Sequence, residues 1–143
     1  MGIRAFAQRI NLETDLADKE FKAMVALAGK PVINMESAIN HPCQSLADWK
    51  TMDDLGIKRQ GGKFVLSWAY HPRALPLAVP SATVHMAAMR GMYVVVSRPP
   101  GFELPDSIMA KARLAAEAAG GSLTEAADPK EAMEGADGIC AKS

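Results

Sequence analysis

The stretch around which the sequence is organised reads Asn34-Met-Glu-Ser-Ala-Ile-Asn-His-Pro-Cys-Gln-Ser-Leu46. An apolar strand over residues 31–35 is predicted to enter this polar turn, and a helix is predicted to leave it. Pro42 suits the first turn of a helix, where a missing N–H costs no hydrogen bond. His41 and Gln44 lie three residues apart, so both side chains can occupy one face of that turn. The N–H groups and partial positive charge of such a helix start favour an anion such as phosphate.

A longer pattern separates this interpretation from a simpler one, in which His41-Pro is a surface turn and Gln44 is merely solvated. The chain also carries Glu36-Ser-Ala ahead of His41-Pro-Cys-Gln, and Ser45-Leu-Ala-Asp48 after it. Together these residues resemble the signature of the aspartate/ornithine carbamoyltransferase superfamily, in which a His-Pro-x-Gln turn binds carbamoyl phosphate. The form with Met-Glu-Ser-Ala is most similar to the branch that acts on N-acylated ornithine, the N-acetyl- and N-succinylornithine carbamoyltransferases.

Length and composition restrict the possible functions. The 143 residues are the size of one typical domain, and 16 basic residues balance 16 acidic ones. We therefore expect neither nucleic acid nor an anionic membrane as a partner. No apolar run approaches the roughly 20 residues that span a bilayer, and no signal peptide is recognisable. Cys43 and Cys140 lack metal-binding spacing, which favours reduced thiols in a cytoplasmic protein and no metal site.

The first third of the chain is predicted to contain two helices. Apolar residues recur at helical spacing over residues 15–28, and Gly29 offers a stop. A second helix is expected over residues 42–55, ended by Gly56. Its apolar stripe consists of Leu46, Trp49 and Met52, and Trp49 is interpreted as a packing residue.

A break in composition at residues 56–62 predicts a domain boundary, with one domain over residues 1–55 and another over 56–143. Strands and helices then alternate regularly, which indicates an α/β fold with a parallel, Rossmann-like sheet and flanking helices. The expected strands cover residues 63–68, 93–97, 122–125 and 138–141, and the expected helices cover 82–90, 107–119 and a short segment after Asp128. Ser81, Asp106 and Asp128 are predicted helix caps, and Gly91, Gly120 and Gly135 are predicted stops.

The loop after the first strand of this sheet argues against dinucleotide binding. It reads Ala69-Tyr-His-Pro-Arg-Ala-Leu-Pro-Leu-Ala-Val-Pro80 and lacks the Gly-x-Gly-x-x-Gly turn that lets a pyrophosphate approach the backbone. We therefore expect no nicotinamide or flavin cofactor, and we reject an unrelated nucleotide-binding domain. In the acylornithine branch a Trp-x-x-His-x-x-x-Leu-Pro pattern occupies this place, which Trp68, His71, Leu75 and Pro76 match. Ordinary ornithine enzymes carry a Gly-Asp-x-x-Asn type of turn instead.

The resemblance implies a role for each matching residue. It assigns Arg4, within Ile-Arg-Ala-Phe, and His41 to the phosphate and the developing oxyanion, and Gln44 to the carbamoyl amide. It assigns Glu36, His71 and Lys142 to the acylornithine, with Lys142 at its α-carboxylate. An arginine or lysine near a terminus can also be an ordinary exposed residue, and His85, which matches no motif, is interpreted as structural.

The resemblance also implies the context of the chain. The family forms homotrimers of two-domain subunits, with a knot at the proline-rich loop, and contributes to arginine biosynthesis. No Ser-x-Arg-Thr-Arg phosphate-binding segment precedes Arg4, so we expect an internal fragment that is inactive alone. Two alternatives are an ornithine carbamoyltransferase and an inactive carbamoyltransferase-like binding module. The choice between acetyl and succinyl substrates is left open.

Overall fold

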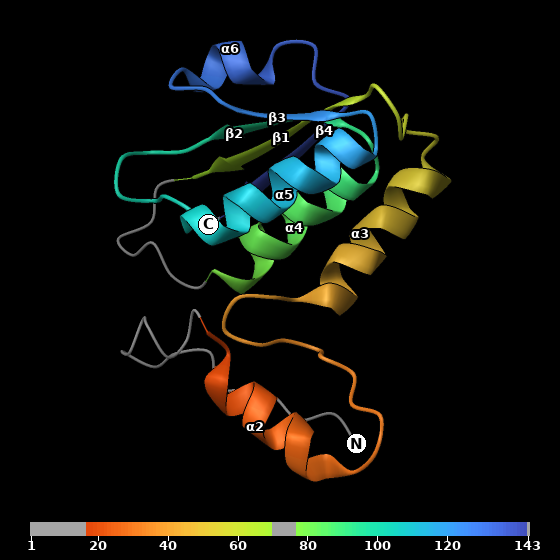
Figure 1. Cartoon of the computed structure of the whole chain (residues 1–143). Helices are drawn as coiled ribbons and strands as arrows, with labels where there is room; N and C mark the ends of the chain where they lie inside the picture. The colour runs from red at the N-terminus through yellow and green to blue at the C-terminus, as the bar shows by residue number, and fades with distance from the viewer. Residues whose placement is uncertain (1–16, 70–76, 143) are drawn as a thin grey trace.

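A computed structural model describes residues 17–69 and 77–142 of the chain (Figure 1). Its centre is a sheet of four strands in the order β3-β2-β1-β4, and all three neighbouring pairs are parallel. The strands are β1 Lys63–Trp68, β2 Tyr93–Ser97, β3 Ser122–Glu125 and β4 Gly138–Lys142. The predicted α/β class with a parallel sheet is confirmed.

Helices cover both faces of this sheet. Helices α4 (Ala78–Met89) and α5 (Asp106–Ala118) lie on one face, and the short α6 (Pro129–Met133) lies on the other (Figure 1). The connection through α6 carries the chain from β3, at one edge, to β4, at the other. The strand order therefore reverses direction between β1 and β4. Ligands of open parallel sheets bind outside the carboxyl ends of the strands at such a point.

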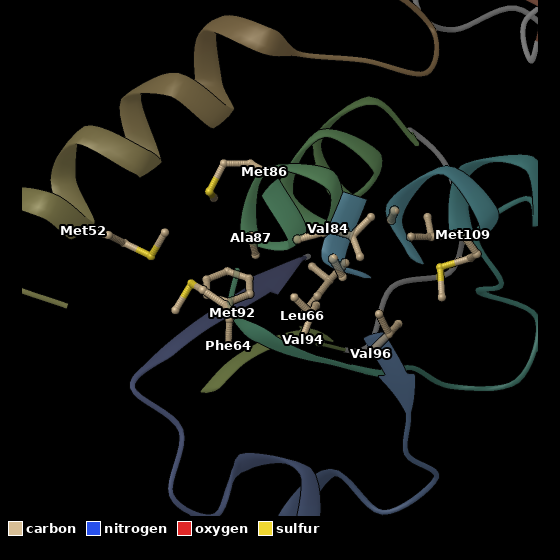
Figure 2. Packing of buried hydrophobic residues seen from close by; sticks show 14 of the residues in the cluster. Met52, Phe64, Leu66, Val84, Met86, Ala87, Met92, Val94, Val96 and Met109 are labelled. Atoms are coloured by element: carbon tan, nitrogen blue, oxygen red, sulfur yellow. The ribbon is translucent and has the colours of Figure 1, made fainter. Parts of the chain in front are cut away.

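The core lies between the sheet and α4. Phe64 and Leu66 from β1 meet Val94 and Val96 from β2, and Val84 from α4 covers them (Figure 2). Residues 64–67 of β1 are all buried, as expected for a central strand of a parallel sheet. Burying one such aliphatic side chain contributes about 1.5–3 kcal/mol. The packed sheet consequently fixes the backbone positions of the residues at its carboxyl edge.

Two of the predicted starts among the helices that flank the sheet are wrong. Helix α4 begins at Ala78 with Leu77 at its N-cap, four residues before the expected start, and Ser81 is not a cap. The reason is that Pro80 falls in the first turn, where no N–H is needed for a helical hydrogen bond. At α5, Asp106 is the first helical residue and Pro105 takes the cap position. The Asp128 cap of α6 is confirmed, since its Oδ1 accepts from the Lys130 backbone N at 2.9 Å.

The segment ahead of the sheet contains α2 (Lys19–Ala28) and α3 (Pro42–Asp54). Helix α2 begins four residues after its expected start, because Asp18 takes the N-cap position in a left-handed conformation, and it ends at the left-handed Gly29. Helix α2 lies away from the sheet, whereas α3 runs beside α4 (Figure 1). The predicted strand over residues 31–35 is wrong, because this extended segment joins no ladder of the described sheet and leaves Ile33 78% exposed. The stripe on α3 is partly wrong: Met52 is buried, but Leu46 is 68% exposed.

Candidate functional site

His41 occupies the N-cap of α3 and makes a specific hydrogen bond there. Its Nδ1 accepts from the backbone N of Gln44 at 3.3 Å, and Pro42 follows it at the first helical position. When Nδ1 accepts, the neutral imidazole carries its proton on Nε2. The cap therefore leaves His41 with an N–H donor at the ring nitrogen that does not face the helix.

Gln44 lies in the first turn of the same helix and is exposed. Its side-chain nitrogen Nε2 donates to Oδ1 of Asp48, one turn further along, at 2.8 Å. This contact occupies the amide nitrogen of Gln44. His41 and Gln44, which the sequence placed on one face of the turn, are thus joined through the helix start.

The turn ahead of α3 is anchored by Ser37, which is completely buried. Its Oγ donates to Asp18 Oδ2 at 2.7 Å and accepts from Asn34 Nδ2 at 3.1 Å. Its backbone N donates to the carbonyl of Asn40 at 2.8 Å. Asp18 has φ 50°, a left-handed conformation that is uncommon outside glycine. Glu36 precedes this anchored serine and is half-buried.

Lys142 belongs to a different part of the structure, the carboxyl end of β4. It is in register with Trp68 at the end of β1, and its carbonyl accepts from the backbone N of Ala69 at 2.8 Å. The two strands are those between which the strand order reverses. Lys142 therefore lies where open parallel sheets bind ligands, as predicted from its strand-end position.

A buried arginine connects α3 to α4. The Arg90 side chain is fully buried at the end of α4, and Nη1 donates to Asp53 Oδ1 at 2.7 Å and to the Trp49 carbonyl at 3.3 Å. Its guanidinium also lies 5.1 Å from the centroid of the Trp49 ring. Burial would raise the pKa of Asp53, but Arg90 and Arg59 bring that pKa below its usual value. The interaction holds α3, with His41 at its N-cap, against α4, which packs on the sheet that carries Lys142.

Sequence reasoning did not assign a role to Arg90. An arginine just ahead of Gly91 is typical of the exposed last turn of a helix, where it interacts favourably with the helix dipole. Its burial depends on the approach of α3 from a remote part of the chain, which local patterns do not reveal.

A groove of about 460 Å³ runs between α3 and β4. It is lined by Asp48 and Met52 from α3 and by Ile139 and Cys140 from β4, among others. Burial, followed by the charge of Asp48, raises the pKa of the Cys140 thiol. Within residues 17–69 and 77–142, no cluster of three metal-ligating side chains occurs.

The predicted site residues fall into three groups. The structure brings His41 and Gln44 together at the start of α3, with Glu36 in the turn ahead of them. It places Lys142 separately, at the carboxyl end of β4. Arg4 and His71 lie outside the described residues.

No protein-family profile matches the chain. Among curated proteins, it is 34% identical over 143 residues to the N-succinylornithine carbamoyltransferase of Bacteroides fragilis. It is 36% identical over 146 residues to the N-acetylornithine carbamoyltransferase of Xanthomonas campestris. Both alignments cover 100% of this chain, but only 41% and 43% of the respective relatives. The chain thus spans about two fifths of the length of the curated relatives it matches.

Solved structures agree with this result. A crystal structure of N-acetyl-L-ornithine transcarbamylase, a mutant complexed with carbamyl phosphate and N-succinyl-L-norvaline, matches with a TM-score of 0.90 and 36% identity. That match covers 99% of this chain and 43% of the other. An equally similar structure is acetylornithine transcarbamylase complexed with acetylcitrulline.

The fold and the turn therefore resemble those of the carbamoyltransferases. Within that class, the chain is similar to the enzymes named for N-acetyl- and N-succinylornithine, so the resemblance seen in Glu36-Ser-Ala and His41-Pro-Cys-Gln is confirmed. No described helix is long and apolar enough to cross a membrane.

Proposed function

We propose that this chain forms part of an enzyme that transfers the carbamoyl group of carbamoyl phosphate to the δ-amine of an N-acylated L-ornithine, a step of arginine biosynthesis. One observation carries the proposal: 99% of the chain matches N-acetyl-L-ornithine transcarbamylase with a TM-score of 0.90 and 36% identity, in a structure complexed with carbamyl phosphate. The Trp68 to Pro76 pattern supports the acylated substrate over free ornithine.

The reaction needs donors aimed at two developing charges. The δ-amine attacks the carbamoyl carbon, a C–N bond forms, and a tetrahedral intermediate collapses as the C–O bond to phosphate breaks. In our proposal, Nε2–H of His41 donates to the oxyanion of that intermediate, while Arg4 and the partial positive charge at the start of α3 bind the phosphate. Gln44 holds the carbamoyl nitrogen in place.

The second substrate is proposed to lie between the start of α3 and the carboxyl edge of the sheet. Lys142 would bind the α-carboxylate of the acylornithine, and Glu36 and His71 would orient the remainder of the molecule. Such orientation brings the amine to the carbonyl carbon and removes much of the entropic cost of the reaction. The amine attacks as the free base, and the departing phosphate can accept its proton.

The proposal includes the context of the chain. Residues 1–55 would belong to a carbamoyl phosphate-binding domain together with the helix that joins the domains, and residues 56–143 to an acylornithine-binding domain. The whole enzyme is proposed to be a cytoplasmic homotrimer with a knot at residues 69–80, needing no cofactor, nucleic acid or membrane. The 143 residues alone are expected to be inactive.

Two alternatives make different predictions. An ornithine carbamoyltransferase would prefer free ornithine as acceptor, whereas an inactive binding module would bind carbamoyl phosphate without transferring the carbamoyl group. The loop after β1 argues against the first, because it lacks the Gly-Asp-x-x-Asn type of turn. Turnover of any acceptor would exclude the second.

The deciding experiment places the chain in a whole enzyme. A chimera would carry residues 1–143 in place of the matching segment of the Xanthomonas campestris enzyme, whose remaining sequence supplies the rest of both domains. We expect labelled carbamoyl phosphate to carbamoylate N-acetyl- or N-succinylornithine in preference to ornithine. A folded chimera that transfers no label would contradict the proposal, and a preference for ornithine would contradict its acylated substrate.

A further inference from the structure

Asp48 restrains the amide of Gln44. The Nε2 atom of Gln44 donates to Asp48 Oδ1 at 2.8 Å, one helical turn along α3. An ionised carboxylate accepts hydrogen bonds but cannot donate them, so the nitrogen of the Gln44 amide, and not its oxygen, must face Asp48. A solvated glutamine amide is free to take either orientation. The contact therefore selects one of the two.

The selected orientation gives the helix start a defined polarity. With its nitrogen turned to Asp48, Gln44 presents Oε1 as the atom that can accept from a ligand. His41 presents the opposite character, because its Nδ1 accepts from the Gln44 backbone and leaves the proton on Nε2. One acceptor and one donor in the same turn complement a carbamoyl group, whose NH₂ donates and whose C=O accepts.

We infer that Asp48 is a positioning residue for the carbamoyl donor, acting through Gln44. The inference rests on the proposed function and deepens it. Asp48 contacts no reacting atom in this account. It determines which end of the Gln44 amide meets the carbamoyl NH₂, and so excludes the arrangement in which two N–H donors would face each other.

The surroundings of Asp48 support this assignment. Gln44 is exposed, whereas Asp48 is half-buried and lines the groove between α3 and β4. A second pair with the same spacing on the same helix, Lys50 and Asp54, has side chains that are 70% and 62% exposed. A pair of that exposed kind adds little even to helix stability. Asp54 is consequently a matched control for Asp48.

The test is a double-mutant cycle in the chimera. Asp48→Ala should lower kcat by about tenfold, and it should leave KM for the acylornithine within about twofold of the parent value. In a Gln44→Ala background, Asp48→Ala should change kcat by less than about twofold, because a residue acting only through Gln44 has nothing left to orient. Asp54→Ala should match the parent enzyme.

Asp48→Asn provides a second variant of similar size. Its side-chain amide can present either an acceptor or a donor to Gln44, so it permits both orientations and should give an intermediate kcat. The thermal unfolding midpoint of each variant would show that the protein is folded.

Two results would overturn the inference. One is a kcat for Asp48→Ala equal to that of Asp54→Ala, and the other is an equal loss with and without Gln44, which would indicate a structural role. Suppose that the chimera is active and loses activity with His41→Ala. Either result then rejects only the role of Asp48 and leaves the proposed function in place. A folded parent chimera without carbamoyl transfer rejects the proposed function, and the inference with it.

Discussion

Arg90 and Asp53 form an ion pair across the packing of α4 against α3, with 2.7 Å between Nη1 and Oδ1 and the arginine side chain fully buried. The two residues lie 37 positions apart in the sequence. The pair joins α3, which His41 caps, to α4, which packs on the sheet that ends with Lys142. The relative positions of the two proposed substrate-binding groups thus depend on a contact distant from both.

Arg90→Met should destabilise the chain by about 2–4 kcal/mol, because it leaves Asp53 without its buried partner and removes the contact with the Trp49 ring. Urea unfolding followed by circular dichroism measures this change. Arg59→Ala is the control: Arg59 contacts the same carboxylate but is 61% exposed, so its loss should cost at most about 1 kcal/mol. Equal decreases in the free energy of unfolding for the two variants would show that the buried pair stabilises the chain no more than the exposed one.

Ser37→Ala should destabilise the chain by about 1–3 kcal/mol, because it deprives Asp18 and Asn34 of hydrogen-bond partners inside the turn. The free energy of unfolding measures this change as well. Ser45→Ala serves as the comparison and should have a small effect, since Ser45 Oγ donates to the Pro42 carbonyl within the same helical turn. If both variants unfold alike, Ser37 is not the anchor of the turn.

His85 should make stability depend on pH. Burial, followed by the positive charge of Lys111, lowers the pKa of this histidine below its ordinary value of 6.5. The unfolded chain then binds more protons, so the contribution of His85 is complete above pH 6.5 and is lost as the pH falls through 6.5 toward the lowered pKa.

Unfolding free energies measured from about pH 7.5 to 5 would test this expectation. The decrease should be smaller in His85→Gln than in the parent chain. The same slope in both would show that other groups cause the dependence.

Lys142→Ala in the chimera should raise KM for the acylornithine by about ten- to a hundredfold, the value of one lost charge-assisted contact, and leave carbamoyl phosphate binding nearly unchanged. His71→Ala should act in the same direction. Steady-state kinetics with each substrate varied in turn measures both. Lys130→Ala, an exposed lysine on α6, is the control. A rise in KM for carbamoyl phosphate alone would place Lys142 at the other substrate.

Much of the sheet was predictable from the sequence. The strands over residues 93–97 and 122–125 have their predicted bounds. The first is an apolar run between glycine-bearing turns, a pattern that specifies a buried parallel strand. The second, Ser-Leu-Thr-Glu, is a mostly exposed strand at the edge of the sheet. The last strand extends one residue beyond the prediction, to Lys142, where pairing with Trp68 continues the ladder. A charged residue at a strand end gives no local signal of that pairing.

Two of the errors share a physical origin, since each concerns a feature that depends on remote contacts. The segment over residues 31–35 has a strand-like pattern but needs a neighbouring strand to form a ladder. Leu46 belongs to the apolar stripe of α3 but is exposed. Among the described residues, other elements bury only the later part of that stripe, at Met52. Of the site, the sequence predicted that His41 and Gln44 lie at the start of one helix, but not the contact of Gln44 with Asp48.

The most direct test of the account is the kcat of His41→Ala in the chimera, measured with saturating carbamoyl phosphate and N-acetyl- or N-succinylornithine. If Nε2–H of His41 stabilises the oxyanion, kcat should fall by about 10²- to 10³-fold while substrate affinity changes little. His85→Gln, which alters a histidine away from the α3 start, should retain the parent kcat. A His41→Ala enzyme with unchanged kcat would show that the turn is structural and would contradict the central claim.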